Sequence, residues 1–289
     1  MAFSFSALLE LLAAQPVLFA ALAALLGLLV GSFLNVVIHR LPQMLQREWQ
    51  EQCAWLDGRT LSTVAPYNLV VPRSACPVCQ HAIAWYENIP VLSWLALRGR
   101  CSQCATPISK RYPLVELLTG LLFGYAAWRW GVGMQTLFVW VLLASLVALS
   151  FIDFDTQLLP DNITLPLLWV GLLINIDGMF CSLDEAVIGA VAGYLALWLI
   201  YHLFKLLTGK EGMGFGDFKL LAALGAWLGW KMLLPIVLAA SFAGALIGIS
   251  FIVFAGRDRA APMPFGPWLA LGGVIALIWG ERLVQVWLG

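Results

Sequence analysis

Charge is scarce in this 289-residue chain. Only 11% of the residues are Asp, Glu, Lys or Arg, against roughly 25% in an average soluble domain. The 16 basic residues balance the 16 acidic ones, so no net charge favours a nucleic acid as partner. With 62% apolar residues and a mean hydropathy of +0.89, the composition is that of an integral membrane protein whose surroundings are a lipid bilayer.

Several catalytic and cofactor patterns are also missing. His39, His81 and His202 are the only histidines, and none adjoins a serine or cysteine as the base of a covalent nucleophile would. Gly209-Lys210 lacks the rest of a phosphate-binding loop, and no glycine-rich dinucleotide-type turn is visible. No basic stretch precedes the first apolar run, so we expect it to remain as a helix and not to be removed as a signal peptide.

Eight apolar runs approach the roughly 20 residues that a membrane-crossing helix needs. They cover residues 16–38, 114–130, 134–152, 162–176, 186–207, 220–230, 232–255 and 266–288. The sixth run is short, rich in glycine and followed by Pro235, so we expect it to be kinked or merged with its neighbour. The sequence therefore predicts an α-helical polytopic membrane protein of about eight transmembrane helices.

The basic residues are distributed unevenly about these runs. If all eight runs cross, one side carries Arg40, Arg47, Arg59, Arg73, Arg98, Arg100, Lys110, Arg111, Lys205, Lys210, Lys219, Arg257 and Arg259. Only Arg129, Lys231 and Arg282 fall on the other side. Because cytoplasmic loops carry the excess of Lys and Arg, the first side is expected to be cytoplasmic and both termini to face outward.

Residues 39–113 form the only sizeable polar segment and are expected to be a small cytoplasmic domain. The segment contains Cys76-Pro-Val-Cys79 and Cys101-Ser-Gln-Cys104, separated by 21 residues, close to the spacing of a tetracysteine zinc pattern. Four thiolates would give the closed tetrahedral shell of a structural Zn²⁺ that staples the domain. Disulfides or free thiols are the alternatives, but a reducing cytoplasm disfavours disulfides. Cys53 and Cys181 lack a partner at ligand spacing.

Acidic residues stand at the edges of the apolar runs. Asp153 directly follows the run 134–152, and Asp217, in Gly214-Phe-Gly-Asp217, precedes the run 220–230. Carboxylates near hydrocarbon are costly and are functional candidates, although they also snorkel to water or pair with lysine. Asp155 lies two residues from Asp153, so on one helix only one of these two can face Asp217. Asp161 follows Pro160 at the start of a run, as a helix N-cap does.

Six features occur together in this chain. They are Gly31-Ser-Phe-Leu-Asn-Val-Val-Ile-His-Arg-Leu-Pro42, the two cysteine pairs, Asn88-Ile-Pro90, Arg111-Tyr-Pro-Leu-Val-Glu116, Asp153 to Asp161, and Gly214-Phe-Gly-Asp217. In these motifs and over nearly its whole length, the chain resembles the type IV prepilin peptidases. These are GxGD-type aspartic proteases of the bacterial inner membrane.

The resemblance implies a function and an organisation. It implies that Asp153 and Asp217 are the catalytic pair of an intramembrane aspartic protease. Its substrates would be type IV prepilins and pseudopilins of type II secretion, cut at the cytoplasmic face after a basic leader. It also implies N-methylation of the new N-terminus with S-adenosyl-L-methionine, by unknown residues. The expected organisation is a first helix at 1–38, a tetracysteine domain associated with methyl transfer at 39–113, and a peptidase domain at 114–289.

Two other functions fit parts of the pattern. A transporter or proton relay could use Asp153 and Asp217 as carriers, but such acids are expected near the membrane midplane and these stand at the edges of the runs. A zinc-stapled scaffold protein without chemistry would make both aspartates dispensable.

Overall fold

The computed structural model describes residues 5–58, 66–255 and 263–288. Within these residues every regular element is a helix, apart from two isolated β-bridges in the cysteine-bearing segment. Arg59, Arg257 and Arg259, which belong to the predicted cytoplasmic set, lie outside the described residues. All eight apolar runs contain helix, so the prediction of a helical protein is confirmed.

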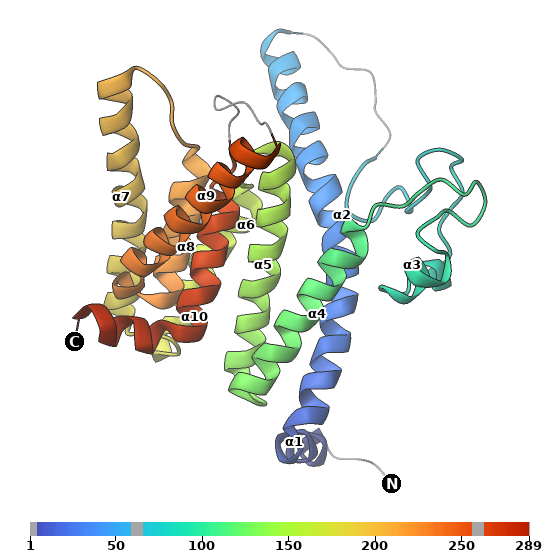
Figure 1. Cartoon of the computed structure of the whole chain (residues 1–289), viewed down its shortest axis with the longest axis horizontal. Coiled ribbons are helices and arrows are strands. Elements are labelled where there is room, and N and C mark those ends of the chain that lie inside the picture. Colours follow the sequence, from blue (N-terminus) through green and yellow to red (C-terminus); the bar gives the residue numbers. More distant parts are fainter. Residues whose placement is uncertain (1–4, 59–65, 256–262, 289) are drawn as a thin grey trace. The chain divides into compact units, whose positions relative to one another are not determined.

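The helices follow the chain in a simple order (Figure 1). They are α1 (Phe5–Ala14), α2 (Pro16–Leu56), η1 (Trp85–Asn88), α3 (Leu92–Ala96), α4 (Arg111–Trp130), α5 (Met134–Thr156), α6 (Asp161–Ile174), η2 (Asn175–Asp177), α7 (Leu183–Thr208), α8 (Phe215–Leu228), η3 (Trp230–Met232), α9 (Leu233–Ala255) and α10 (Gly266–Leu288).

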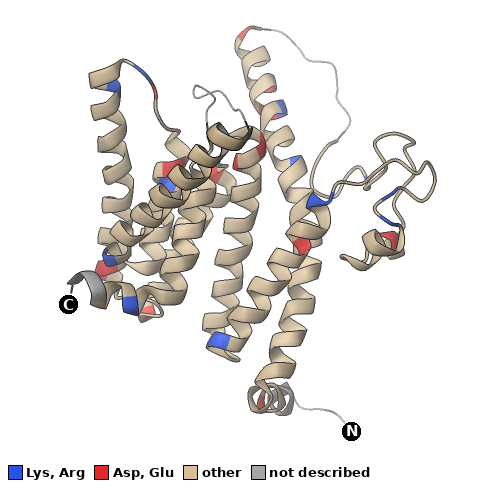
Figure 2. Ribbon diagram, in the orientation of Figure 1, with Lys and Arg blue, Asp and Glu red and all other residues tan. Residues whose placement is uncertain are grey.

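Four of the described helical segments are long and apolar enough to cross a bilayer. They are α2, α5, α7 and the segment Trp230–Ser250. Figure 2 shows long uncharged stretches in these helices, with most charged residues near helix ends or in loops. The count of eight crossings stays a prediction, because helices such as α8 are short. Its 14 residues span about 21 Å at about 1.5 Å per residue, less than the roughly 30 Å hydrocarbon core.

Helix α2 is longer than the sequence predicted. It continues past residue 38 to Leu56 and contains Pro42 within it. Residues 43–56 are mostly Gln, Glu, Leu, Met, Arg and Ala, which are strong helix formers, so the helix continues into the polar segment. The segment predicted as a cytoplasmic domain therefore begins as a helical extension of the first apolar run.

The chain divides into two compact units, residues 1–148 and 149–289, with the boundary inside α5. In the first unit, α2 and α4 approach closely at small residues. A Cβ added to Gly31 would lie 2.7 Å from the Cα of Glu116, and one on Gly27 would lie 2.7 Å from the carbonyl oxygen of Thr119. Small residues of this kind let helix backbones pack together in a membrane.

Buried polar side chains attach the segment between α2 and α4 to those helices. Arg40 of α2 donates to the carbonyl oxygen of Asn68 at 2.9 Å, and Asn35 donates to that of Tyr112 at 3.1 Å. Glu116 of α4 accepts the backbone N–H of Val91 at 2.8 Å. Buried polar groups need such partners, so these bonds fix where the segment leaves and rejoins the helix pair.

The second unit is built around α8. Ten of its 14 residues are buried, and helices α6, α7 and α10 pack against it. Each of these helices brings a glycine to the contact: Gly171 meets Trp227, Gly193 meets Leu221, and Gly273 meets Leu224. Without these glycines the neighbouring backbones could not approach a helix this closely.

The far end of α8 is closed by a buried amide. Asn175 donates from Nδ2 to the carbonyl oxygens of Ala226 at 2.9 Å and Trp227 at 3.1 Å. The last carbonyls of a helix have no partner within it, so Asn175 satisfies them. Trp227 in turn donates to the carbonyl oxygen of Leu167 at 2.7 Å. These bonds hold α8 in place, with Asp217 at its opposite, N-terminal end.

Candidate active site and metal centre

Asp153 lies in the last turn of α5 and is 5% exposed. Its Oδ2 accepts the backbone N–H of Gly266, the first residue of α10, at 2.9 Å. Asp155, two residues further along the helix, is exposed. The helical spacing required that these two side chains point in different directions, and the structure turns Asp153 inward.

Asp217 lies in the first turn of α8 and is 6% exposed. Gly214 occupies the N-cap position, and its carbonyl oxygen accepts the backbone N–H of Asp217 at 3.3 Å. The carboxyl oxygen Oδ1 of Asp217 is buried with no hydrogen-bond partner among the described residues. A carboxyl group at a helix N-terminus is favoured by the helix dipole, which helps to explain why an acid is tolerated here.

The two aspartates are brought to the same place. Gly216, next to Asp217, and Gly266, bonded to Asp153, both pack against Leu159. A Cβ on Gly216 would lie 2.6 Å from the Cβ of Leu159, and a Cβ on Gly266 would lie 3.0 Å from Leu159 Cδ2. Four helix ends therefore converge around Leu159: the end of α5 and the starts of α6, α8 and α10.

The interpretation of Asp161 as a helix N-cap is wrong. Pro160 occupies the cap position, and Asp161 is the first residue of α6. Both of its carboxylate oxygens accept hydrogen bonds from Lys219 Nζ, each at 2.7 Å. Lys219 follows Asp217 by two residues in α8, so this ion pair joins the starts of α6 and α8 beside the buried aspartates. Lys219 thus forms its ion pair with Asp161.

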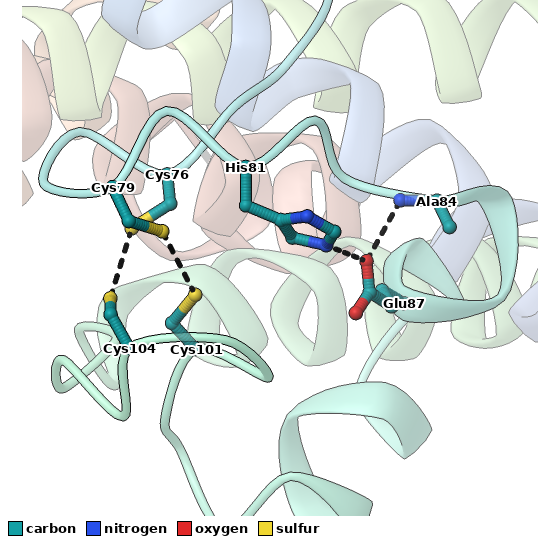
Figure 3. A network of polar contacts seen from close by, with 7 residues as sticks. All are labelled: Cys76, Cys79, His81, Ala84, Glu87, Cys101 and Cys104. Carbon is teal, nitrogen blue, oxygen red and sulfur yellow. Dashed lines mark hydrogen bonds and ion pairs between the residues drawn. The ribbon is translucent and has the colours of Figure 1, made fainter.

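The four predicted cysteines form one cluster (Figure 3). The Sγ atoms of Cys76 and Cys104 are 3.7 Å apart, those of Cys79 and Cys101 are 3.9 Å apart, and all four lie within 4.8 Å of one another. Four thiolates about 2.3 Å from a tetrahedral metal ion would be about 3.8 Å apart. The cluster therefore fits a metal such as Zn²⁺, and all of the cysteines are free of disulfides.

The two cysteine turns are built alike. Cys76 donates its N–H to the His81 carbonyl, and its own carbonyl accepts the N–H of Gln80. Cys101 makes the same two bonds with Thr106 and Ala105, and all four bonds measure 2.9–3.0 Å. Gln80 and Ala105 both have a positive φ, of 58° and 56°. The repeated geometry points both pairs of thiols at one centre, as the C-x₂-C spacing predicts.

Hydrogen bonds shape the electrostatics around this cluster. The hydroxyl and backbone amide of Thr106 lower the pKa of the Cys104 thiol to about 6, which favours the thiolate that binds metal. Glu87 accepts hydrogen bonds from the Ala84 amide and the His81 ring (Figure 3). The nearby Ser102 hydroxyl, together with these donors, lowers the pKa of Glu87 to about 2. The Glu87 carboxylate thereby holds the His81 ring beside the Cys76–Cys79 turn.

Comparison with known proteins identifies the family. Residues 25–130 match the bacterial peptidase A24 N-terminal domain, and residues 140–249 match the type IV leader peptidase family. The chain belongs to the type IV leader peptidase family. The family's relatives named prepilin leader peptidase/N-methyltransferase include proteins of Stutzerimonas stutzeri, 54% identical over 96% of this chain and 97% of the relative, and Aeromonas hydrophila, 56% identical over 97% and 98%.

A third relative with the same name, from Pseudomonas aeruginosa, is 52% identical over 97% of this chain and 97% of its own length. No solved structure matches the chain. The two family domains meet between residues 130 and 140, within or just before α5. Both matched regions are therefore present in this one chain.

Sequence reasoning gave no role to two residues for which the structure shows buried polar contacts. Gly266 bonds Asp153, and its signal in the sequence was a glycine between Phe265 and Pro267 at the start of the last apolar run. Glu116 is a buried carboxyl inside an apolar run, which is a functional signal in itself. Its motif carried the family resemblance, but no role was assigned to it.

The two glycines that flank Phe215 should differ in their tolerance of alanine. A Cβ on Gly216 would overlap the Cβ of Leu159, which cannot rotate away, whereas one on Gly214 would meet only Asp217 Oδ2 at 3.9 Å. Gly216→Ala is therefore expected to destabilise the fold by about 1–3 kcal/mol, and Gly214→Ala by less than about 1 kcal/mol. Thermal unfolding in detergent measures both variants; equal losses would contradict the packing described.

Proposed function

We propose that this chain removes the basic leader peptide of type IV prepilins and type II secretion pseudopilins and then N-methylates the new N-terminal residue. The full-length similarity to relatives named prepilin leader peptidase/N-methyltransferase supports this function. The single structural observation that carries it is the burial of Asp153 and Asp217 at neighbouring helix ends, where the Gly266 amide holds Asp153 Oδ2.

The proposed cleavage uses one aspartate as base and the other as acid. Two neighbouring carboxyl groups in an apolar site share one proton. The ionised group takes a proton from water, and the water oxygen attacks the scissile carbonyl carbon. The protonated group hydrogen-bonds the carbonyl oxygen and then helps to protonate the leaving amine as the C–N bond breaks. No covalent enzyme intermediate forms in this scheme.

The proposed location is the inner membrane, with the site facing the cytoplasm. The basic residues of the loops support this orientation through the positive-inside rule. Asp153, Asp161 and Asp217 all lie at helix ends. A substrate's apolar helix could then lie in the bilayer beside the enzyme's helices, while its basic leader stays in the cytoplasm and its cleavage point meets the two aspartates at the interface.

Methyl transfer needs S-adenosyl-L-methionine, which supplies the methyl group to the new amine. No strand occurs in the described residues, so the strand–turn–helix fingerprint that binds dinucleotides is not present there. We assign no residue and no step to this cofactor. The N-terminal family domain, residues 25–130, is the part of the chain proposed to carry the activity.

The metal proposed for the cysteine cluster is a structural Zn²⁺. Cys76, Cys79, Cys101 and Cys104 offer four sulfur ligands at tetrahedral spacing. A complete shell of protein ligands leaves no position for substrate, which is typical of a structural site and not of a catalytic one. The segment around the cluster contains only the short elements η1 and α3, so the metal would supply much of its stability.

Replacing either catalytic aspartate tests the peptidase function. Asp153→Asn and Asp217→Asn are each expected to lower the rate of prepilin cleavage by about 10²- to 10⁴-fold, because the acid–base pair is lost. The measurement uses purified protein in nanodiscs and a prepilin peptide followed by mass spectrometry. Asp155→Asn, an exposed neighbour on the same helix, is the matched control and should cleave close to the wild-type rate.

Each contrary result excludes something specific. A wild-type protein that leaves the peptide uncut excludes the peptidase and favours a transporter or a scaffold. Efficient cleavage by either Asn variant excludes the aspartate pair. Thermal unfolding of every variant shows whether a loss of cleavage reflects a loss of fold.

Metal analysis tests the zinc site. The wild-type protein is expected to contain one Zn²⁺ per chain, and the variant with Ser at positions 76, 79, 101 and 104 is expected to contain none, because the sulfur ligands are gone. A variant with Ser at positions 53 and 181, which lie outside the cluster, should keep its zinc. Unchanged metal in the four-serine variant, or no zinc in the wild type, would remove the assignment.

A further inference from the structure

The start of α10 touches the candidate active site although neither aspartate motif includes it. Gly266 lies 113 residues beyond Asp153, and the hydrogen bond from its N–H to Asp153 Oδ2 is buried. Phe154 follows Asp153 in the chain, and Trp268 lies two residues after Gly266. Their rings pack edge to face, with 6.1 Å between the ring centroids. Two contacts therefore fix the start of α10 against the end of α5.

The N–H of Gly266 is free to make this bond because of its place in the helix. The first four N–H groups of a helix have no partner inside it, and Gly266 is the first residue of α10. The next residue, Pro267, has no N–H. The turn itself is closed independently, since the N–H groups of Trp268 and Leu269 both donate to the Phe265 carbonyl at 3.1 Å. Gly266 therefore offers its donor to Asp153 without weakening α10.

Space is the reason that this position requires glycine. A Cβ there would lie 2.7 Å from Asp153 Oδ2 and 3.0 and 3.1 Å from the two methyl carbons of Leu159. The leucine methyls belong to a flexible side chain and can move. The Asp153 oxygen can withdraw only by breaking the hydrogen bond. Any side chain at this position would therefore displace the carboxyl group.

We propose that Gly266 is a positioning residue for the peptidase reaction and that the start of α10 is a third segment of its active site. The backbone N–H fixes Asp153 Oδ2, so the carboxyl group keeps one orientation and leaves its Oδ1 for proton transfer with the attacking water. Gly266 acts only through Asp153. This inference rests on the proposed function of Asp153 and Asp217.

Adding one methyl group tests the need for glycine. Gly266→Ala is expected to lower kcat for prepilin cleavage by about 10²-fold, the effect of misplacing a reacting group by about 1 Å. KM should change little, because substrate binding is not the affected step. Gly133→Ala is the matched control: Gly133 also stands at a helix start, just before α5, and a Cβ there meets nothing within 4 Å.

A double variant separates displacement of Asp153 from simple crowding of Leu159. Leu159→Ala removes the leucine methyls that the new Cβ would meet. If the new methyl group displaces Asp153, Gly266→Ala lowers kcat by the same factor in the Leu159→Ala protein as in the wild type. Recovery of kcat in the double variant means that crowding was the cause, and overturns the proposal.

Removing the donor alone tests the hydrogen bond and does not depend on how Gly266→Ala folds. Glycolic acid in place of Gly266, introduced by an acylated suppressor tRNA during cell-free synthesis into nanodiscs, replaces the N–H with an oxygen and adds no atoms. It is expected to lower kcat by about 10- to 10²-fold, the range for a lost hydrogen bond to a charged group. Glycolic acid in place of Gly133 controls for the ester bond.

The same assay distinguishes failure of the positioning role from failure of the function. Wild-type protein and Asp153→Asn are measured alongside. If the wild type does not cleave, or Asp153→Asn cleaves equally well, the proposed peptidase falls and the positioning role falls with it. If these two behave as expected but the glycolic acid variant keeps the wild-type kcat, the peptidase stands and the role of Gly266 is wrong.

Discussion

A carboxyl group buried among apolar helices must be stabilised by nearby polar groups, and the second unit of this chain stabilises two such carboxyl groups with the backbone of helix N-termini. Asp153 accepts the N–H of Gly266 at the start of α10, and Asp217 lies in the first turn of α8. Leaving such groups unpaired in an apolar interior is costly. Backbone donors are suited to the task because they are fixed by the helices and add no charge of their own.

Close approach of backbones makes this arrangement possible. Helix α8 is short and buried, and its neighbours reach it through Gly171, Gly193 and Gly273. Its N-terminus meets the starts of α6 and α10, so three helix N-termini surround the two aspartates. Helix N-termini favour negative charge, and the Lys219–Asp161 pair holds two of them together. The fold thus concentrates stabilising dipoles where it buries acidic side chains.

Much of the helical layout could be predicted from hydropathy. Each apolar run contains helix, and the C-x₂-C spacing predicted the cysteine cluster because both turns are local structures. The two aspartates stood out because carboxyl groups are rare beside apolar runs. The length of α2 was missed, since its continuation is polar and hydropathy marks only the apolar part.

Other features depend on contacts between distant residues and leave little trace in the sequence. The partner of Asp161 is Lys219, 58 residues away, and local pattern suggested a helix cap instead. Gly266 reads as an ordinary helix start until α5 is placed beside it. The periodicity of the transmembrane runs gave no help, because helices that are apolar on every face show no preferred side.

In the folded chain, the end of α5 and the start of α8 bring positions 153 and 217 together. The most direct test replaces Asp153 and Asp217 with cysteine, and Cys53 and Cys181 with serine, and treats the folded protein in nanodiscs with a short bifunctional thiol reagent. The account predicts a cross-link within one chain, found by mass spectrometry between the peptides that contain residues 153 and 217. Modification of each cysteine separately, with no cross-link between them, would contradict it.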